Sequence, residues 1–295
     1  MKALLITATS LLTIACQPQA HPQAAQEAAS RPALVVGRAA ATTPAKATAS
    51  VSEVAPLETL PPALQALVRK HDLTPLLQTV KGDEDHSQNG FFGPEHRRID
   101  FVFTHVQRDI TNPNVYHLQG QDRYKGVVTP FEGTFTVSHF GQAPRFSAER
   151  LARYRKYSAA QKDPPLVNLT EGGFALYEDS TRRGAGVFRG KVSIAWRVDN
   201  ERGLEFDYQT EVMSSEGGGL KYEGTWTNSK THRSYPVVWV EDIYFYNSRQ
   251  NVLADFNVGE RSPEVNPKYA RLGWNKYWEN EEWWAKTPRR DTGLL

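Results

Sequence analysis

Cysteine, methionine and excess charge are scarce in this chain of 295 residues. One cysteine excludes an internal disulfide framework and any zinc site made of four cysteines. The 35 Lys and Arg residues nearly balance the 33 Asp and Glu residues, which leaves a formal net charge of +2. Such a balance gives no reason to expect a nucleic acid as partner. Because 39% of the residues are hydrophobic, the chain can still bury a core.

Aromatic residues are missing from the first 90 positions, since all 13 Phe, 12 Tyr and 7 Trp residues lie at or beyond Phe91. Residues 17–55 consist mainly of Ala, Pro, Gln, Thr and Ser. This composition cannot bury enough apolar surface to offset the entropy lost on ordering. It predicts a disordered tether rather than a folded domain.

A long hydrophobic run is also missing, and the apolar stretch at residues 3–12 is too short for a membrane-spanning helix, which needs about 20 residues. Together with Lys2 and the only cysteine, Cys16, it has the three-part organisation of an export signal. The ending resembles the lipobox of bacterial lipoproteins, although Thr13 stands where leucine is usual. The resemblance implies acylation of Cys16 and a lipid anchor in the cell envelope, and Gln17 favours the outer membrane. An ordinary cleaved signal is the alternative.

The chain is therefore predicted to have three parts. They are a lipoprotein signal peptide at residues 1–15, a tether at residues 16–56 and one β-rich domain at residues 57–295. The domain should begin with a short helix, because Pro61 and Pro62 can open one and leucines then recur at helical spacing.

Beyond Phe91 the hydrophobic period changes to two, which is typical of β-strands with one wet face. Strands are predicted at residues 99–105, 131–139, 188–198 and 204–212, with further strands at 115–120, 220–228 and 235–245. We expect Trp196 to face the core and Glu205 and Asp207 to face water. A short basic helix at residues 148–156 should connect the two halves. The predicted fold is mainly β: an antiparallel meander of about eight strands, forming a barrel or a sandwich, with a tryptophan-rich helix at the C-terminus.

Two strand segments resemble each other. Residues 131–136 and 222–227 both read aromatic-Glu-Gly-Thr-aromatic-Thr. The match indicates either an internal duplication of residues 91–140 and 186–228 or convergence on a favourable strand pattern. In either case, the glycine should relieve a tight bend or lie under an aromatic ring.

This strand pattern, the Phe92-Gly93 pair and the closing Pro267-Lys268-Tyr269 and Gly273-Trp274 resemble a family of envelope lipoproteins from Bacteroidetes-type bacteria. The resemblance covers residues 90–284, and its motifs are loose. It implies export and a β-rich fold. It transfers no catalytic residue.

The strongest candidate site is a group of aromatic residues near the C-terminus, which places four of the seven tryptophans within eleven residues. We call it the C-terminal aromatic group: Trp274, Tyr277, Trp278, Trp283 and Trp284. Such a stripe is most often the apolar face by which a terminal helix closes a sheet or barrel. The alternative is a platform on which sugar rings stack, with the indole N–H groups orienting them.

Acidic residues form a second candidate. Glu205, Asp207 and Glu211 alternate along one predicted strand, and neighbours on one face would stand about 6.6 Å apart, which suits a pair of glycosidase carboxylates. However, the facing row of Arg189, Lys191 and Arg197 explains them completely as an exposed charge ladder.

Histidines form a third candidate, but a weak one. His105 and His139 each end an apolar strand face, and His96 and His117 lie nearby in the sequence. No carboxylate or spacing motif supports them as metal ligands, so neither a metal nor a cofactor is predicted.

These observations favour a lipid-anchored envelope protein that binds a small ligand or a glycan. Its predicted partners are the membrane, through the lipid on Cys16, and that ligand. A glycoside-acting enzyme and a structural envelope component that binds other proteins are the alternatives.

Overall fold

The computed structural model describes the greater part of the predicted β-rich domain. The described residues are 60–82, 85–157, 163–164, 166–208, 215–243, 245–246, 270–276 and 282–285. They form nine strands: β1 (Gln88–Phe92), β2 (Arg97–Arg108), β3 (Val115–Tyr124), β4 (Val127–Ala143), β5 (Val167–Glu178), β6 (Gly186–Asp199), β7 (Gly203–Phe206), β8 (Leu220–Asn228) and β9 (Ser234–Val240). The helices are α1 (Pro62–Lys70), α2 (Thr74–Leu77), α3 (Ala148–Tyr157) and the short 3-10 helix η2 (Trp274–Lys276). The predicted signal peptide and tether lie outside the described residues.

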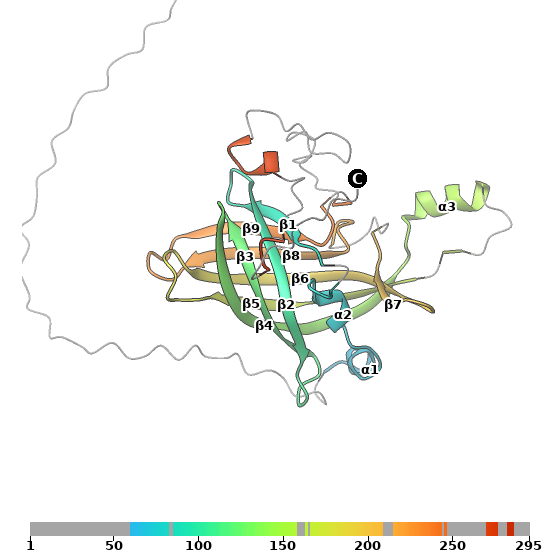
Figure 1. Cartoon of the computed structure of the whole chain (residues 1–295). Coiled ribbons are helices and arrows are strands. Elements are labelled where there is room, and N and C mark those ends of the chain that lie inside the picture. Colours follow the sequence, from blue (N-terminus) through green and yellow to red (C-terminus); the bar gives the residue numbers. More distant parts are fainter. Residues whose placement is uncertain are drawn as a thin grey trace, which may run out of the picture. The chain divides into compact units, whose positions relative to one another are not determined.

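The strands form one antiparallel sheet that curves round to meet itself (Figure 1). Neighbours follow the order β5-β4-β3-β2-β1-β9-β8-β6, and β6 pairs again with β5, so eight strands make a ring. β6 also pairs with β7: residues 186–194 of β6 bind β8, and residues 196–199 bind β7. The prediction of a mainly β, antiparallel fold is confirmed.

Alternation along the strands divides an apolar interior from an outer face, as the sequence pattern predicted. In β6, Phe188, Val192, Ile194 and Trp196 are buried, whereas Arg189 and Lys191 are exposed. Other strands contribute large rings to the same interior, such as the stacked pair Phe101 and Trp239, whose centroids lie 4.0 Å apart. Burial of these rings supplies most of the driving force for folding.

One end of the ring is filled by α1 and α2, and we call it the closed end. The apolar side chains of the two helices are buried in the same core as the strands: Leu64, Leu67, Val68, Leu76 and Leu77. The backbone N–H of Leu73, just before α2, donates to the buried Tyr116 hydroxyl over 3.1 Å. The predicted N-terminal helix is confirmed, and its role is to close the interior at this end.

The sequence pattern missed β1 and β5. In β5 the row that faces the interior runs Thr170, Gly172, Phe174, Leu176 and Glu178, so polar residues and a glycine interrupt its apolar period. β1 reads QNGFF and has no alternation long enough to detect. Both strands are therefore recognisable only from their pairing partners.

The predictions of two further helices had different outcomes. The predicted basic helix is present as α3, which buries no residue and extends away from the sheet (Figure 1). The predicted tryptophan-rich C-terminal helix is not shown, because Trp274 lies in η2 and Trp283 and Trp284 lie in a turn. No helix in the described ranges combines the length and apolarity needed to cross a membrane.

Candidate functional site

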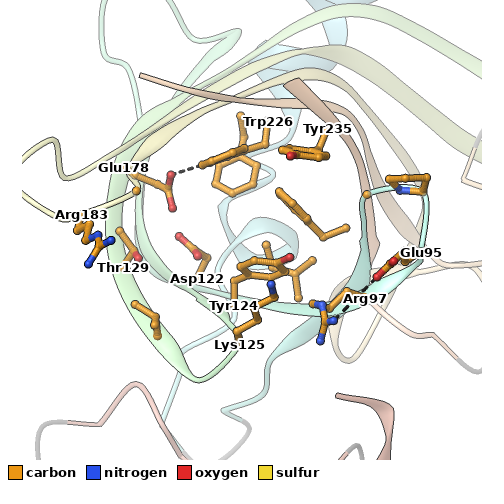
Figure 2. Close-up of a pocket in the computed structure, with 17 residues that line it drawn as sticks. Glu95, Arg97, Asp122, Tyr124, Lys125, Thr129, Glu178, Arg183, Trp226 and Tyr235 are labelled. Carbon is orange, nitrogen blue, oxygen red and sulfur yellow. Dashed lines mark hydrogen bonds and ion pairs between the residues drawn. The ribbon is translucent and has the colours of Figure 1, made fainter. Parts of the chain in front are cut away.

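A cavity of about 600 Å³ opens at the end of the ring opposite α1 and α2, which we call the open end. Its lining comes from the last residues of β1, β3, β5 and β8 and the first residues of β2, β4, β6 and β9. Because neighbouring strands are antiparallel, these residues all meet at one end of the sheet. Figure 2 shows the view into this cavity.

Two carboxyl groups face each other inside the cavity, and we call Asp122 and Glu178 the carboxyl pair (Figure 2). Asp122 continues the inward row of β3 after Tyr116, Leu118 and Gly120, as Glu178 continues that of β5. Strand β4 lies between them: Thr129 is paired with Asp122, and Phe131 is paired with Glu178. The period of two therefore carries both acids into an otherwise apolar interior.

Glu178 is held in place by two N–H donors. Its Oε2 accepts hydrogen bonds from the Trp226 indole Nε1 over 2.7 Å and from the Gly186 backbone N over 2.5 Å. Gly186 must be glycine, because a Cβ there would lie 2.5 Å from the Trp226 ring and from the backbone oxygen of Thr227. The close approach lets Trp226 reach the carboxylate.

The two acids of the carboxyl pair differ in how well the protein stabilises their charged forms. Asp122 is only 1% exposed, and as two carboxylates the pair would leave its buried Oδ2 without a donor. Burial, the charge of Glu178 and the hydrogen bond to Glu178 raise the pKa of Asp122 well above its usual range. Burial also raises the pKa of Glu178, but the N–H groups of Trp226 and Gly186 oppose this by stabilising its charged form. Of the two acids, Glu178 is therefore the better placed to carry a negative charge, and Asp122 is the better placed to stay protonated.

Four aromatic side chains form one side of the cavity, and we call them the aromatic wall: Phe92, Tyr124, Trp226 and Tyr235. Phe92 lies at its centre, with its ring centroid 4.6 Å from that of Tyr124, 5.5 Å from Trp226 and 5.6 Å from Tyr235. These rings come from β1, β3, β8 and β9, so closure of the ring through the β1–β9 pairing assembles the wall.

Charged side chains surround the opening (Figure 2). Arg97, Lys125 and Arg183, the rim cations, line the cavity near its mouth, and Lys125 and Arg183 are exposed. The Lys125 ammonium lies 5.3 Å from the Tyr124 ring centroid, and Arg97 lies 4.0 Å from Glu95. The rim thus carries three cations and one acid, whereas the interior carries the carboxyl pair.

The C-terminal aromatic group does not line this cavity in its described part. Trp274 is fully buried on the outer face of the sheet, with its ring 5.0 Å from Phe91 and its indole N–H donating to the His96 carbonyl over 2.8 Å. Trp283 and Trp284 are partly exposed, and the guanidinium of Arg123 lies 5.1 Å from the Trp283 ring. Tyr277 and Trp278 lie outside the described residues.

The predicted acidic row is divided by the structure. Glu205 accepts a hydrogen bond from the Arg197 guanidinium over 2.6 Å at the surface, but Asp207 is only 2% exposed and lies 3.0 Å from the Arg145 Nε. The prediction that Asp207 faces water is therefore wrong. Strand β7 ends at Phe206, so the alternation stops before it reaches Asp207. Glu211 lies outside the described residues.

The candidate histidines do not converge. His105 and His139 are exposed because a β-bulge directly before each of them shifts the alternation, which turns both side chains out of the interior. His117 pairs with Asp109 over 2.9 Å, and His96 occupies a turn with a φ of 55°. Within the described ranges no group of three His, Cys, Asp or Glu residues could hold a metal ion.

Sequence reasoning missed the carboxyl pair and the aromatic wall. The available signal was an acid two residues beyond a buried strand row, as in Gly120 to Asp122 and Leu176 to Glu178. That signal is weak alone, because strands often end in polar residues. Comparison of the chain with protein-family models, curated proteins and solved structures finds no match.

Proposed function

We propose that this protein binds a small molecule in the cavity at the open end, with the ring acting as a small β-barrel closed at its other end. The observation that carries the proposal is a carboxyl pair, with Asp122 buried and Glu178 half-buried, that faces an aromatic wall in a cavity of about 600 Å³. Ligand sites of this size are typically apolar clefts with a few converging polar groups, and the mouths of barrels are common places for them. The polar pair would orient the ligand, and the rings would supply contact area.

Binding explains this arrangement better than glycoside hydrolysis does. Retaining glycosidases hold their carboxyl groups about 5 to 5.5 Å apart, and inverting enzymes hold them farther apart, so that the glycosidic bond fits between them. Asp122 and Glu178 lie within hydrogen-bonding reach of each other, so a glycosidic bond does not fit between them. The acids suggested by the sequence do not form a catalytic pair either. Glu205 pairs with Arg197, and Asp207 pairs with a different arginine, Arg145.

Tryptophan fluorescence tests the location of the site. A small-molecule library screened by thermal shift should give binders that quench the wild-type protein, and Trp226→Phe should weaken their binding at least about tenfold because the Glu178 hydrogen bond is lost. The matched control is Trp284→Phe, which alters an aromatic residue outside the cavity. If Trp284→Phe abolishes binding and Trp226→Phe leaves it intact, the site is the C-terminal aromatic group, and a stacking platform for glycans replaces this proposal.

The address proposed for this binding module is the cell envelope, with a lipid on Cys16 and the outer membrane as the destination. The support is the signal-like segment that ends at this cysteine. Cys16→Ser should shift the full-length protein from the detergent phase to the aqueous phase, or leave it unprocessed. Unchanged partitioning in the detergent phase would contradict lipid attachment at this residue.

A further inference from the structure

We infer that the cavity selects a ligand with an ammonium group at its inner end and an acidic group at its outer end. This inference rests on the proposed function, because it specifies which molecules the same cavity accepts. Three features carry it: the charge of the carboxyl pair, the faces of the aromatic wall and the cations of the rim.

The inner end of the cavity holds a carboxyl pair that lacks a basic partner among the described residues. The donors to the Glu178 carboxylate are the neutral N–H groups of Trp226 and Gly186. Among the described residues, no Lys, Arg or His forms an ion pair with Asp122 or Glu178. A carboxylate that is partly withdrawn from water and has no opposite charge is costly, so a ligand cation placed here would supply the missing partner.

The aromatic wall favours the same kind of group. The face of an aromatic ring carries partial negative charge and attracts an ammonium within about 6 Å of its centroid, most strongly for tryptophan. Trp226 both lines the cavity and binds Glu178, so a cation beside the carboxylate would also lie near this ring. Tyr235 extends the wall beside it, with a centroid separation of 6.2 Å.

The rim has the opposite polarity. Arg97, Lys125 and Arg183 line the mouth, and Glu95 is the only acid among the lining residues there. The rim cations would repel a ligand that carries only positive charge. They would attract a ligand with a carboxylate or phosphate at its outer end. The cavity is thus negative inside and positive outside, which matches a zwitterion that enters with its ammonium group first.

A series of six-carbon compounds that differ only in their end groups provides a direct test. We would measure displacement of the neutral dye Nile red from the full-length protein by 6-aminohexanoate, hexylamine, 1-hexanol and hexanoate. The expected order of affinity is the order of this list, with 6-aminohexanoate at least tenfold tighter than 1-hexanol. Hexanoate should bind most weakly. With its carboxylate inward it would be repelled by Glu178, and with its carboxylate at the rim it would place only a methyl group beside the carboxyl pair.

Two variants separate charge from shape in the carboxyl pair. Glu178→Gln should remove the preference for 6-aminohexanoate and hexylamine over 1-hexanol, because the charge is gone. Asp122→Asn should retain that preference, since the inference assigns the charge to Glu178. The control is Glu132→Gln, which removes an exposed carboxylate of β4 outside the cavity. Lys125→Gln should lower only the advantage of 6-aminohexanoate over hexylamine.

The outcomes distinguish this inference from the proposed function. Nile red that binds and is displaced equally well by hexylamine and 1-hexanol would leave the proposed site standing and overturn the charge selection. A preference for hexanoate would overturn it as well. If Trp226→Phe has no effect on Nile red binding, the cavity is not the site, and both proposals fail. Should Glu178→Gln not fold, as judged by near-UV circular dichroism, equal affinities across the series for the wild-type protein still decide against the inference.

Discussion

The two ends of the ring are built from the same strands and differ in nearly every other respect. At the closed end Tyr116 and Trp196 lie in an apolar core sealed by α1 and α2, and even the Trp196 indole N–H is satisfied within it, by the Thr170 hydroxyl over 2.9 Å. At the open end the inward row of β3 reaches Asp122, and the space beside it is hollow. The stabilising core and the polar site therefore lie at opposite ends of the same strand, β3. Substitutions at the two ends should accordingly have separable effects on stability and on ligand binding.

The largest effect is expected from Trp196→Ala at the closed end. Removing a fully buried tryptophan leaves a cavity and a hydroxyl without its donor, so the free energy of unfolding should fall by roughly 3 to 5 kcal/mol. Trp226→Ala at the open end should lower the free energy of unfolding less than Trp196→Ala does. The difference between the two losses should be at least about 1 kcal/mol, because the Trp226 ring already borders the cavity. Urea titrations of both variants measure the difference, and equal losses would break the comparison between the ends.

A glycine at the open end, Gly186, should also be needed for stability, although less than Trp196. In Gly186→Ala the new Cβ would collide with the Trp226 ring and the Thr227 carbonyl, so we expect a loss of about 1 to 3 kcal/mol together with weakened ligand binding. Gly141→Ala on β4 is the control, because the nearest atom to its Cβ would be the His139 Nε2 at 3.6 Å. Chemical denaturation that finds Gly141→Ala the more damaging would show that the close approach at Gly186 is relaxed in solution.

The carboxyl pair predicts how stability depends on pH. The pKa of Asp122 is raised in the folded state, so between its ordinary value near 4 and this raised value the folded protein binds more protons than the unfolded chain. The contribution of Asp122 to stability is therefore full below about pH 4 and is lost as the pH rises through the raised pKa. Asp122→Asn should flatten this decline in urea titrations between pH 4 and 9, whereas Glu132→Gln should retain it. An identical slope in Asp122→Asn and the wild type would place the proton elsewhere.

The smallest effect is expected from Glu205→Gln at the surface. Its ion pair with Arg197 is partly exposed, and such pairs contribute little, so the unfolding free energy should change by less than about 0.5 kcal/mol. Asp207→Asn should cost clearly more, because the carboxylate that faces Arg145 is buried. A thermal or urea measurement with the opposite order would mean that the two acids have been assigned to the wrong environments.

Sequence periodicity was informative where one face of a strand is apolar throughout and failed where function or irregular backbone interrupts that face. The predicted strand at residues 220–228 coincides with β8, and the buried row of β6 was identified up to Trp196. By contrast, β5 was not predicted, in part because Glu178 places a charged residue on its inward row, where the pattern requires an apolar one. His105 was predicted on the wrong face because a β-bulge shifts the register by one residue, and the amino-acid composition does not reveal such a bulge.

The candidate site was unpredictable for a related physical reason. Asp122 and Glu178 are 56 positions apart in the numbering and meet only because β3 and β5 both pair with β4. Nothing local indicates that meeting. The C-terminal tryptophans attracted attention by their density, yet Trp274 is explained by packing on the outer face against Phe91.

The pairing of β1 with β9 also determines when the interior can exist during folding. Asn89 pairs with Val240, so this pairing joins the first strand of the ring to the last one along the chain. The entropy lost in closing so long a segment must be overcome before these contacts contribute, which makes such steps slow. A chain still being synthesised, or truncated before β9, would present the unpaired edges of β1 and β8, and exposed strand edges favour aggregation. Because the aromatic wall needs the β1–β9 pairing, any ligand bound in the cavity would report that this pairing has formed.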